Sequence, residues 1–208
     1  MKKDLLILVA DKDTESCLKG LLPRFPDIFT LKAFTYDIIM HPLKDAGCYT
    51  LSHEFLRPFT KSYDYCIVVF DYEGCGQDKN MSIENVENNV KELLTKNGWE
   101  NRCEVIVIEP ELENWIWVQS KHLAEEIRWQ SIEELHQWLV ENNLKEQDAA
   151  KPKRPKEAFQ AALRKSGKRL SPAIYEDIAK KASFKKCIDK SFIAFCDYIK
   201  QCFSINHV

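Results

Sequence analysis

The chain has 208 residues, of which 45% are hydrophobic and 30% are charged, and its formal net charge is −2. These values are typical of a globular protein whose core is large enough to fold without disulfides or structural metals. No run approaches the roughly 20 apolar residues that a membrane-spanning helix needs, so a membrane partner is not expected.

The first residues, MKKDLLILVADKD, combine basic and apolar character, but Asp4 interrupts the run and Asp11 and Asp13 follow it. A signal peptide would have a small-residue cleavage site there instead. The eight cysteines are scattered, with no CxxC pair and no Cys–His cluster at zinc spacing. We therefore predict reduced thiols and a cytoplasmic location.

The first 110 residues alternate apolar, strand-like runs with helical patterns. Strands are predicted at 4–10, 30–40, 65–71 and 103–109. Three helices are predicted between them. The first begins at a cap formed by Asp13 or Thr14, the second lies within a loop-and-helix segment at 41–59, and the third begins near 82. This alternation predicts an α/β fold with a four-stranded, mostly parallel, Rossmann-like sheet.

No convincing strand follows Pro110. Helices are predicted at 111–119, 131–143, 155–167, 172–182 and 190–203, and a polar, proline-containing loop at 145–157. We therefore predict an α/β core over residues 1–119 and a helical, basic C-terminal region over 120–208 that packs on the core.

Residues 145–190 are strongly basic. They contain fourteen Lys or Arg and six Asp or Glu, a net charge of +8, so the rest of the chain carries −10. This asymmetry fits a polyanionic partner such as nucleic acid, with Lys153, Arg154 and Lys156 as candidate phosphate contacts, although a solvated helix face gives the same count. Trp115 and Trp117 could stack on bases, but we expect Trp115 to be a core residue.

Acidic residues follow three of the predicted strands. The first strand ends at Asp11, the third at Asp71 followed by Glu73, and the fourth at Glu109 followed by Glu111 and Glu113. The carboxyl ends of parallel strands meet at one edge of a sheet, and residues two apart on an extended backbone share a face. Carboxylates without interleaved His or Cys favour Mg²⁺ or Mn²⁺.

Some of these residues have a simpler interpretation. Acids after strands often cap helices, which is the favoured reading for Asp13 and Glu15 and a plausible one for Glu111. Asp45 and Gly47 are interpreted as turn residues.

The order LVADKDTE, VVFDYEG and VIEPELENW resembles the TOPRIM fold, and most of all a family of small bacterial TOPRIM-related proteins of unknown function. The segments KPKRPKEAF and SFKKCIDKSFIAF are also similar to that family, so the resemblance covers nearly the whole chain. Two positions depart from the usual pattern: Asp11 stands where glutamate is usual, and Glu73 where aspartate is usual.

The resemblance implies a Mg²⁺-dependent (or Mn²⁺-dependent) nuclease that hydrolyses DNA or RNA, in bacterial anti-phage defence and beside an ATPase partner. It implies proton transfer by Asp11, metal binding by Asp71 and Glu73, and a further ligand at Glu111 or Glu113. One alternative is a non-catalytic TOPRIM-like subunit that binds a protein partner such as an ATPase. Another alternative is a nucleotide-binding regulatory domain, but the sequence has no GxxxxGK[ST] phosphate-binding loop, which counts against it. Association with further copies of the chain is left open.

Overall fold

The computed structural model describes residues 2–77, 81–184 and 187–205. A single four-stranded sheet forms from β1 (Lys3–Val9), β2 (Tyr36–Met40), β3 (Tyr63–Asp71) and β4 (Cys103–Ile108). Its order is β2-β1-β3-β4, and every neighbouring pair is parallel. The predicted four-stranded, Rossmann-like α/β fold is confirmed.

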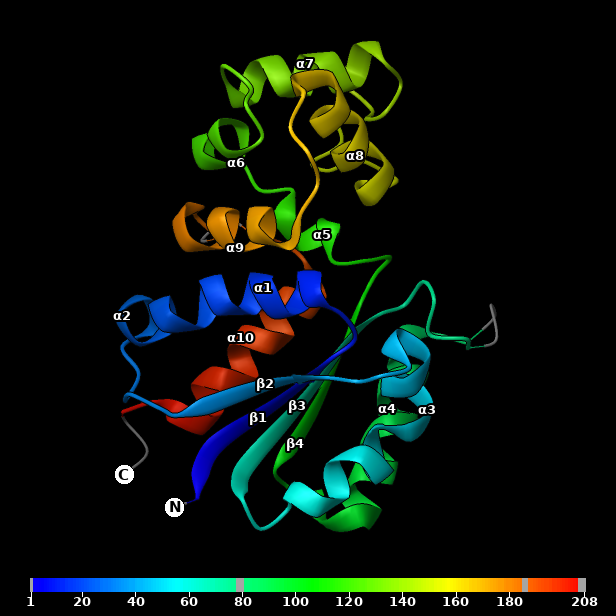
Figure 1. Ribbon diagram of the computed structural model, residues 1–208, viewed down its shortest axis with the longest axis vertical. Coiled ribbons are helices and arrows are strands. Elements are labelled where there is room, and N and C mark those ends of the chain that lie inside the picture. The colour runs from blue at the N-terminus through cyan, green and yellow to red at the C-terminus, as the bar shows by residue number, and fades with distance from the viewer. Residues whose placement is uncertain (1, 78–80, 185–186, 206–208) are drawn as a thin grey trace.

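Helices surround the sheet and extend from it at one end (Figure 1). They are α1 (Lys12–Leu21), α2 (Phe25–Phe29), α3 (Lys44–Leu56), α4 (Ile83–Leu94), α5 (Glu113–Ile116), α6 (Lys121–Glu126), α7 (Ile132–Glu141), α8 (Pro155–Ser166), α9 (Pro172–Lys181) and α10 (Lys190–Phe203). In Figure 1, α1 and α10 lie on one side of the sheet and α3 and α4 on the other, while α6, α7 and α8 lie beyond α9.

Strands β1, β3 and β4 are buried on both faces over most of their length, which explains their nearly continuous apolar runs, whereas β2 is only partly buried. In β1, Leu5, Ile7 and Val9 belong to the core shared with α1 and α10, whereas Leu6 and Leu8 belong to the core shared with α3 and α4. This alternation follows from the two-residue period of a strand.

Helix α9, from the C-terminal half of the chain, packs directly against α1. The contact depends on Gly20, because a Cβ atom there would lie 2.5 Å from the Glu176 carbonyl oxygen and 2.7 Å from the Ala179 Cβ. Glycine is needed at this point to let the two helix backbones approach each other.

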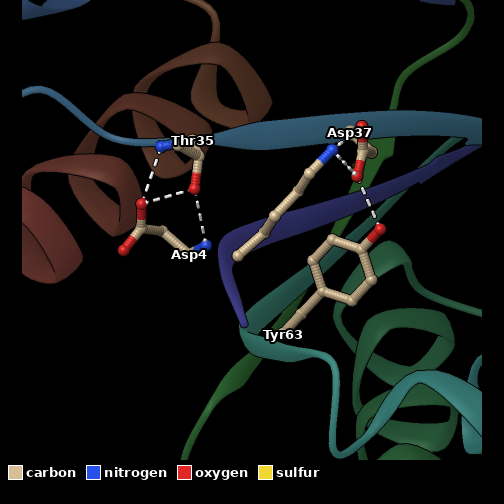
Figure 2. A network of polar contacts seen from close by, with 5 residues as sticks. Asp4, Thr35, Asp37 and Tyr63 are labelled. Atoms are coloured by element: carbon tan, nitrogen blue, oxygen red, sulfur yellow. Dashed lines mark hydrogen bonds and ion pairs between the residues drawn. The ribbon is translucent and has the colours of Figure 1, made fainter. Parts of the chain in front are cut away.

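At the amino-terminal ends of the strands, the carboxylates of Asp4 and Asp37 both have partners on neighbouring segments (Figure 2). Asp4 accepts hydrogen bonds from the backbone N–H and the hydroxyl of Thr35, both at 2.7 Å. Asp37 is bound by the Lys3 ammonium at 2.8 Å and by the Tyr63 hydroxyl at 2.6 Å. These contacts tie β1, β2 and β3 together at this edge.

Two local predictions are wrong. The α1 N-cap is Asp11, whose carboxylate accepts the Thr14 N–H at 2.8 Å, and neither Asp13 nor Thr14 caps the helix. Asp45 and Gly47 do not form a turn but lie in α3, where Gly47 packs on the buried His41 ring with no room for a Cβ atom.

Helices α7, α8, α9 and α10 match their predicted positions closely, whereas α5 covers only Glu113–Ile116 of the predicted 111–119 range. Two short helices, α2 and α6, were not predicted. The prolines near α2 occupy first-turn positions, where a missing N–H costs nothing, so the chain continues helically after α1. In the described part of the chain, none of the helices combines the length and apolar character needed to cross a bilayer.

Candidate functional site

Acidic side chains gather at the carboxyl edge of the sheet. Asp71 is the last residue of β3, Asp11 directly precedes α1, and Asp45 lies in the first turn of α3. Glu113 begins α5, which follows β4. We call these four residues the acidic cluster.

Asp71 is the most buried aspartate of the acidic cluster, with 8% of its surface exposed. Its backbone N–H donates to the Asp45 Oδ1 at 2.9 Å, but its own Oδ1 is buried and has no hydrogen-bond partner among the described residues. Buried polar atoms are almost always hydrogen-bonded. An unpartnered carboxylate oxygen therefore marks a place where a ligand could bind, in contrast to the paired acids at the other end of the strands.

The electrostatics of the cluster disfavour a fully ionised state. Burial is the largest reason why the pKa of Asp71 is raised well above its usual value, and the negative charges of Asp45, Asp11 and Glu113 raise it further. Burial likewise raises the pKa of Asp45 and of Glu113. Added positive charge would relieve this repulsion.

Glu113 and Glu111 both have partners within the chain. Glu113, with 3% of its surface exposed, accepts a hydrogen bond from the Tyr175 hydroxyl of α9 at 2.6 Å. Glu111 accepts the Lys156 backbone N–H at 3.1 Å and lies 3.3 Å from the Lys156 ammonium. These contacts attach α8 and α9 to the segment that follows β4.

Glu73 and Asp71 lie in different environments, since Asp71 is buried and Glu73 is exposed. The backbone N–H of Glu73 donates to the Pro110 carbonyl at 3.1 Å. The strand ends at Asp71 and the chain turns at Gly74, where φ is +95°. The expected shared face therefore does not form, because the two-residue alternation of a strand stops at its end.

Asp45 belongs to the acidic cluster but was not predicted as a site residue. Its sequence context, between Pro42 and Gly47, is typical of a turn. The signal that could have identified it is its position shortly after β2, because the loop after a parallel strand emerges at the same edge as Asp11 and Asp71.

The three basic candidates have different environments. Lys153 is exposed, and Arg154 is exposed and pairs with Glu157 at 2.8 Å. Lys156 instead contacts Glu111, and its charge lowers the pKa of Asp71 and of Asp45 against the larger effect of burial. All three are exposed at the surface, and of these three only Lys156 contacts Glu111 at the acidic edge of the sheet.

Neither tryptophan candidate offers an exposed ring. Trp115 is completely buried, donates its Nε1–H to the Ser191 hydroxyl at 2.8 Å and packs edge-on against Phe192. Trp117 is 3% exposed and donates to the Pro155 carbonyl at 2.9 Å. The expectation that Trp115 is a core residue is confirmed, and base stacking on these two rings is not available.

Replacing Trp115 with phenylalanine is expected to lower the free energy of unfolding by about 1–2 kcal/mol, since it removes one hydrogen bond and leaves a small cavity. Chemical denaturation measures the change. Ile193→Val, at a 43% exposed position on the same helix as Phe192, should alter stability by less than about 0.5 kcal/mol. Equal effects of the two substitutions would contradict the packing role of Trp115.

The donor chemistry of the acidic cluster fits a small, hard cation, because all its donors are carboxylate oxygens and one buried oxygen, Asp71 Oδ1, has no hydrogen-bond partner over residues 2–77, 81–184 and 187–205. Among the residues described, no three Asp, Glu, His or Cys side chains are positioned to hold a metal ion together. Mg²⁺ commonly uses one or two protein carboxylates and completes its coordination with water or phosphate oxygens. Asp71 with Asp45 would be sufficient protein ligands of that kind.

Compared with protein-family models, with curated proteins and with solved structures, the chain matches none of them.

Proposed function

We propose that the protein is a divalent-cation-dependent, TOPRIM-like phosphodiester hydrolase that acts on DNA or RNA. The observation that carries this proposal is the buried Oδ1 of Asp71, which lies within a group of carboxylates and has no hydrogen-bond partner in the described part of the chain. The resemblance of the strand-end motifs to TOPRIM proteins gives the reaction class, and it also suggests a role in anti-phage defence beside an ATPase.

Asp71 and Asp45 would hold the cation, Mg²⁺ or Mn²⁺. When bound, the ion would neutralise phosphate charge and lower the pKa of a water molecule. Asp11 is the candidate for proton transfer, although its carboxylate also caps α1. Lys153 and Arg154 are exposed on the loop before α8 and could contact nucleic-acid phosphates.

The ligand assignment differs from the sequence-based one at four residues: Glu73, Glu111 and Glu113 are no longer ligands, and Asp45 is added. Glu73 is exposed, Glu111 is bonded to Lys156 and Glu113 is bonded to Tyr175. In this proposal Glu111 and Glu113 keep α8 and α9 against the site, and Asp45 takes the place that the sequence assigned to Glu73.

A second candidate is a non-catalytic subunit that binds a protein partner such as an ATPase. The observation that favours it is the state of the carboxylates after β4: two of them already have partners from the C-terminal helices, as expected for a site that has become structural. The two candidates differ in whether cation binding leads to hydrolysis.

The test is incubation of the full chain with single-stranded DNA, double-stranded DNA and RNA in the presence of Mg²⁺ or Mn²⁺. Cleavage that stops with EDTA, and falls by at least about 100-fold in Asp71→Asn, is the expected result. Glu73→Gln serves as the matched control and should retain cleavage. Cation binding without cleavage of any substrate would overturn the hydrolase and leave the non-catalytic candidate.

A further inference from the structure

Lys156 lies at the start of α8, more than eighty residues along the chain from β3, yet it contacts the acidic edge of the sheet through two groups. Its backbone N–H donates to the Glu111 Oε1 at 3.1 Å, and its ammonium lies 3.3 Å from the Glu111 Oε2. Helix α8 has no side-chain N-cap of its own. The Glu111 carboxylate therefore takes that role and fixes the beginning of α8 at the site.

The ammonium of Lys156 affects more than Glu111. Its charge counts among the influences on Asp13, Asp45, Asp71 and Glu113, in each case opposing the effect of burial. The carboxylates act in return: although burial lowers the pKa of Lys156, the charges of Glu113, Glu111 and Asp71 raise it overall. Lys156 is thus close enough to partly neutralise three members of the acidic cluster, Asp45, Asp71 and Glu113.

We propose that Lys156 is a built-in counter-ion of the acidic cluster, and that a divalent cation and the Lys156 ammonium compete to neutralise the same carboxylates. This inference rests on the proposed cation site. Half of the Lys156 side chain is exposed, at 49%, so the ammonium can move into solvent without disturbing the core. Even with Lys156 nearby, Asp71 Oδ1 has no hydrogen bond from any residue that the structure describes, so a cation would still gain a ligand there.

The competition has a direct consequence for cation affinity. A positive charge a few ångströms from a bound cation weakens its binding by electrostatic repulsion. Removing the charge of Lys156 should therefore strengthen cation binding, whereas removing a ligand or an unrelated surface charge should not.

Binding of Mn²⁺ alone to the full chain, followed by electron paramagnetic resonance of the free ion, tests this. Lys156→Met is expected to bind Mn²⁺ about tenfold more tightly than wild type. Lys156→Arg, which keeps the charge, should bind as wild type does. Lys153→Met, three residues earlier in the chain and exposed, is the matched control and should change the affinity by less than about twofold.

The outcomes separate this inference from the proposed function. Mn²⁺ binding with equal or weaker affinity in Lys156→Met overturns the counter-ion role and leaves the cation site intact. Binding by Lys156→Met but not by wild type supports the counter-ion role and contradicts a cation-ready site in the unmodified protein. Absence of binding in both overturns both.

Discussion

The Asp71→Asn protein is expected to melt at a higher temperature than wild type without cations, and to lose the stabilisation that Mg²⁺ gives to wild type. Asn removes a buried negative charge from beside Asp45, Asp11 and Glu113, and its amide can donate to those carboxylates. The expected gain is about 1–3 kcal/mol. Wild type, at a Mg²⁺ concentration of 100 times the Kd, should gain about 2.7 kcal/mol from ligand binding.

The difference between the two proteins should depend on pH. Because the pKa of Asp71 is raised in the folded state, the folded protein binds a proton more readily than the unfolded chain does. Wild type therefore loses stability as the pH rises from about 4, the ordinary pKa of an aspartate in the unfolded chain, to the raised pKa of Asp71 in the folded protein. The advantage of Asp71→Asn should be largest at neutral pH and shrink on acidification.

Thermal melts at several pH values, with and without Mg²⁺, measure both effects. Glu73→Gln is the control, because Glu73 is an exposed acid two residues away. It should change neither the ion-free midpoint nor the response to Mg²⁺ by more than about 1–2 °C. A full Mg²⁺ response in Asp71→Asn, or its loss in Glu73→Gln, would contradict the assignment of Asp71 as the central ligand.

Replacing Gly20 with alanine should destabilise the protein by about 2–3 kcal/mol, or roughly 4–12 °C in Tm. On an isolated helix the same change would stabilise, since alanine is favoured over glycine by up to about 1 kcal/mol. Here the sign reverses, because the new Cβ atom would lie 2.5 Å from the Glu176 carbonyl oxygen of α9. Helices α1 and α9 must separate to accept it.

The separation should also reach the acidic cluster, because α9 holds Tyr175 against Glu113. We therefore expect Gly20→Ala to weaken the Mg²⁺ response as well as stability. Lys19→Ala, at the neighbouring exposed position with a surface ion pair to Glu15, should cost less than about 1 kcal/mol. Equal stability of Gly20→Ala and wild type would show that α1 and α9 do not pack as closely as described.

The sheet was predictable because its strands carry a strong local signal. The third strand, for example, is apolar without interruption from Cys66 to Phe70, as expected for a parallel strand covered on both faces. The positions of Asp11 and Asp71 followed from the same reasoning, because parallel strands end at a common edge. The short helices α2 and α6 lacked such a signal. The predicted N-cap of α1, Asp13 or Thr14, lies only two or three residues after the observed one, Asp11.

The residues that surround the acids at this edge could not be predicted from local sequence patterns. Asp45 reaches the cluster because α3 packs against β3, and Glu73 leaves it because the strand ends first. Lys156 and Tyr175 lie on helices far along the chain from the strands. No spacing in the sequence indicates that Lys156 contacts Glu111 or that Tyr175 contacts Glu113.

By itself, the sequence determined the α/β sheet, the order of its strands along the chain and the edge at which the acids collect, since these depend on short-range periodicity and on where strands end. Tertiary structure alone decided which acid is buried without a partner and which cation lies beside it. Burial and charge neutralisation depend on how helices distant in the sequence pack together, and a local pattern of residues does not predict that packing.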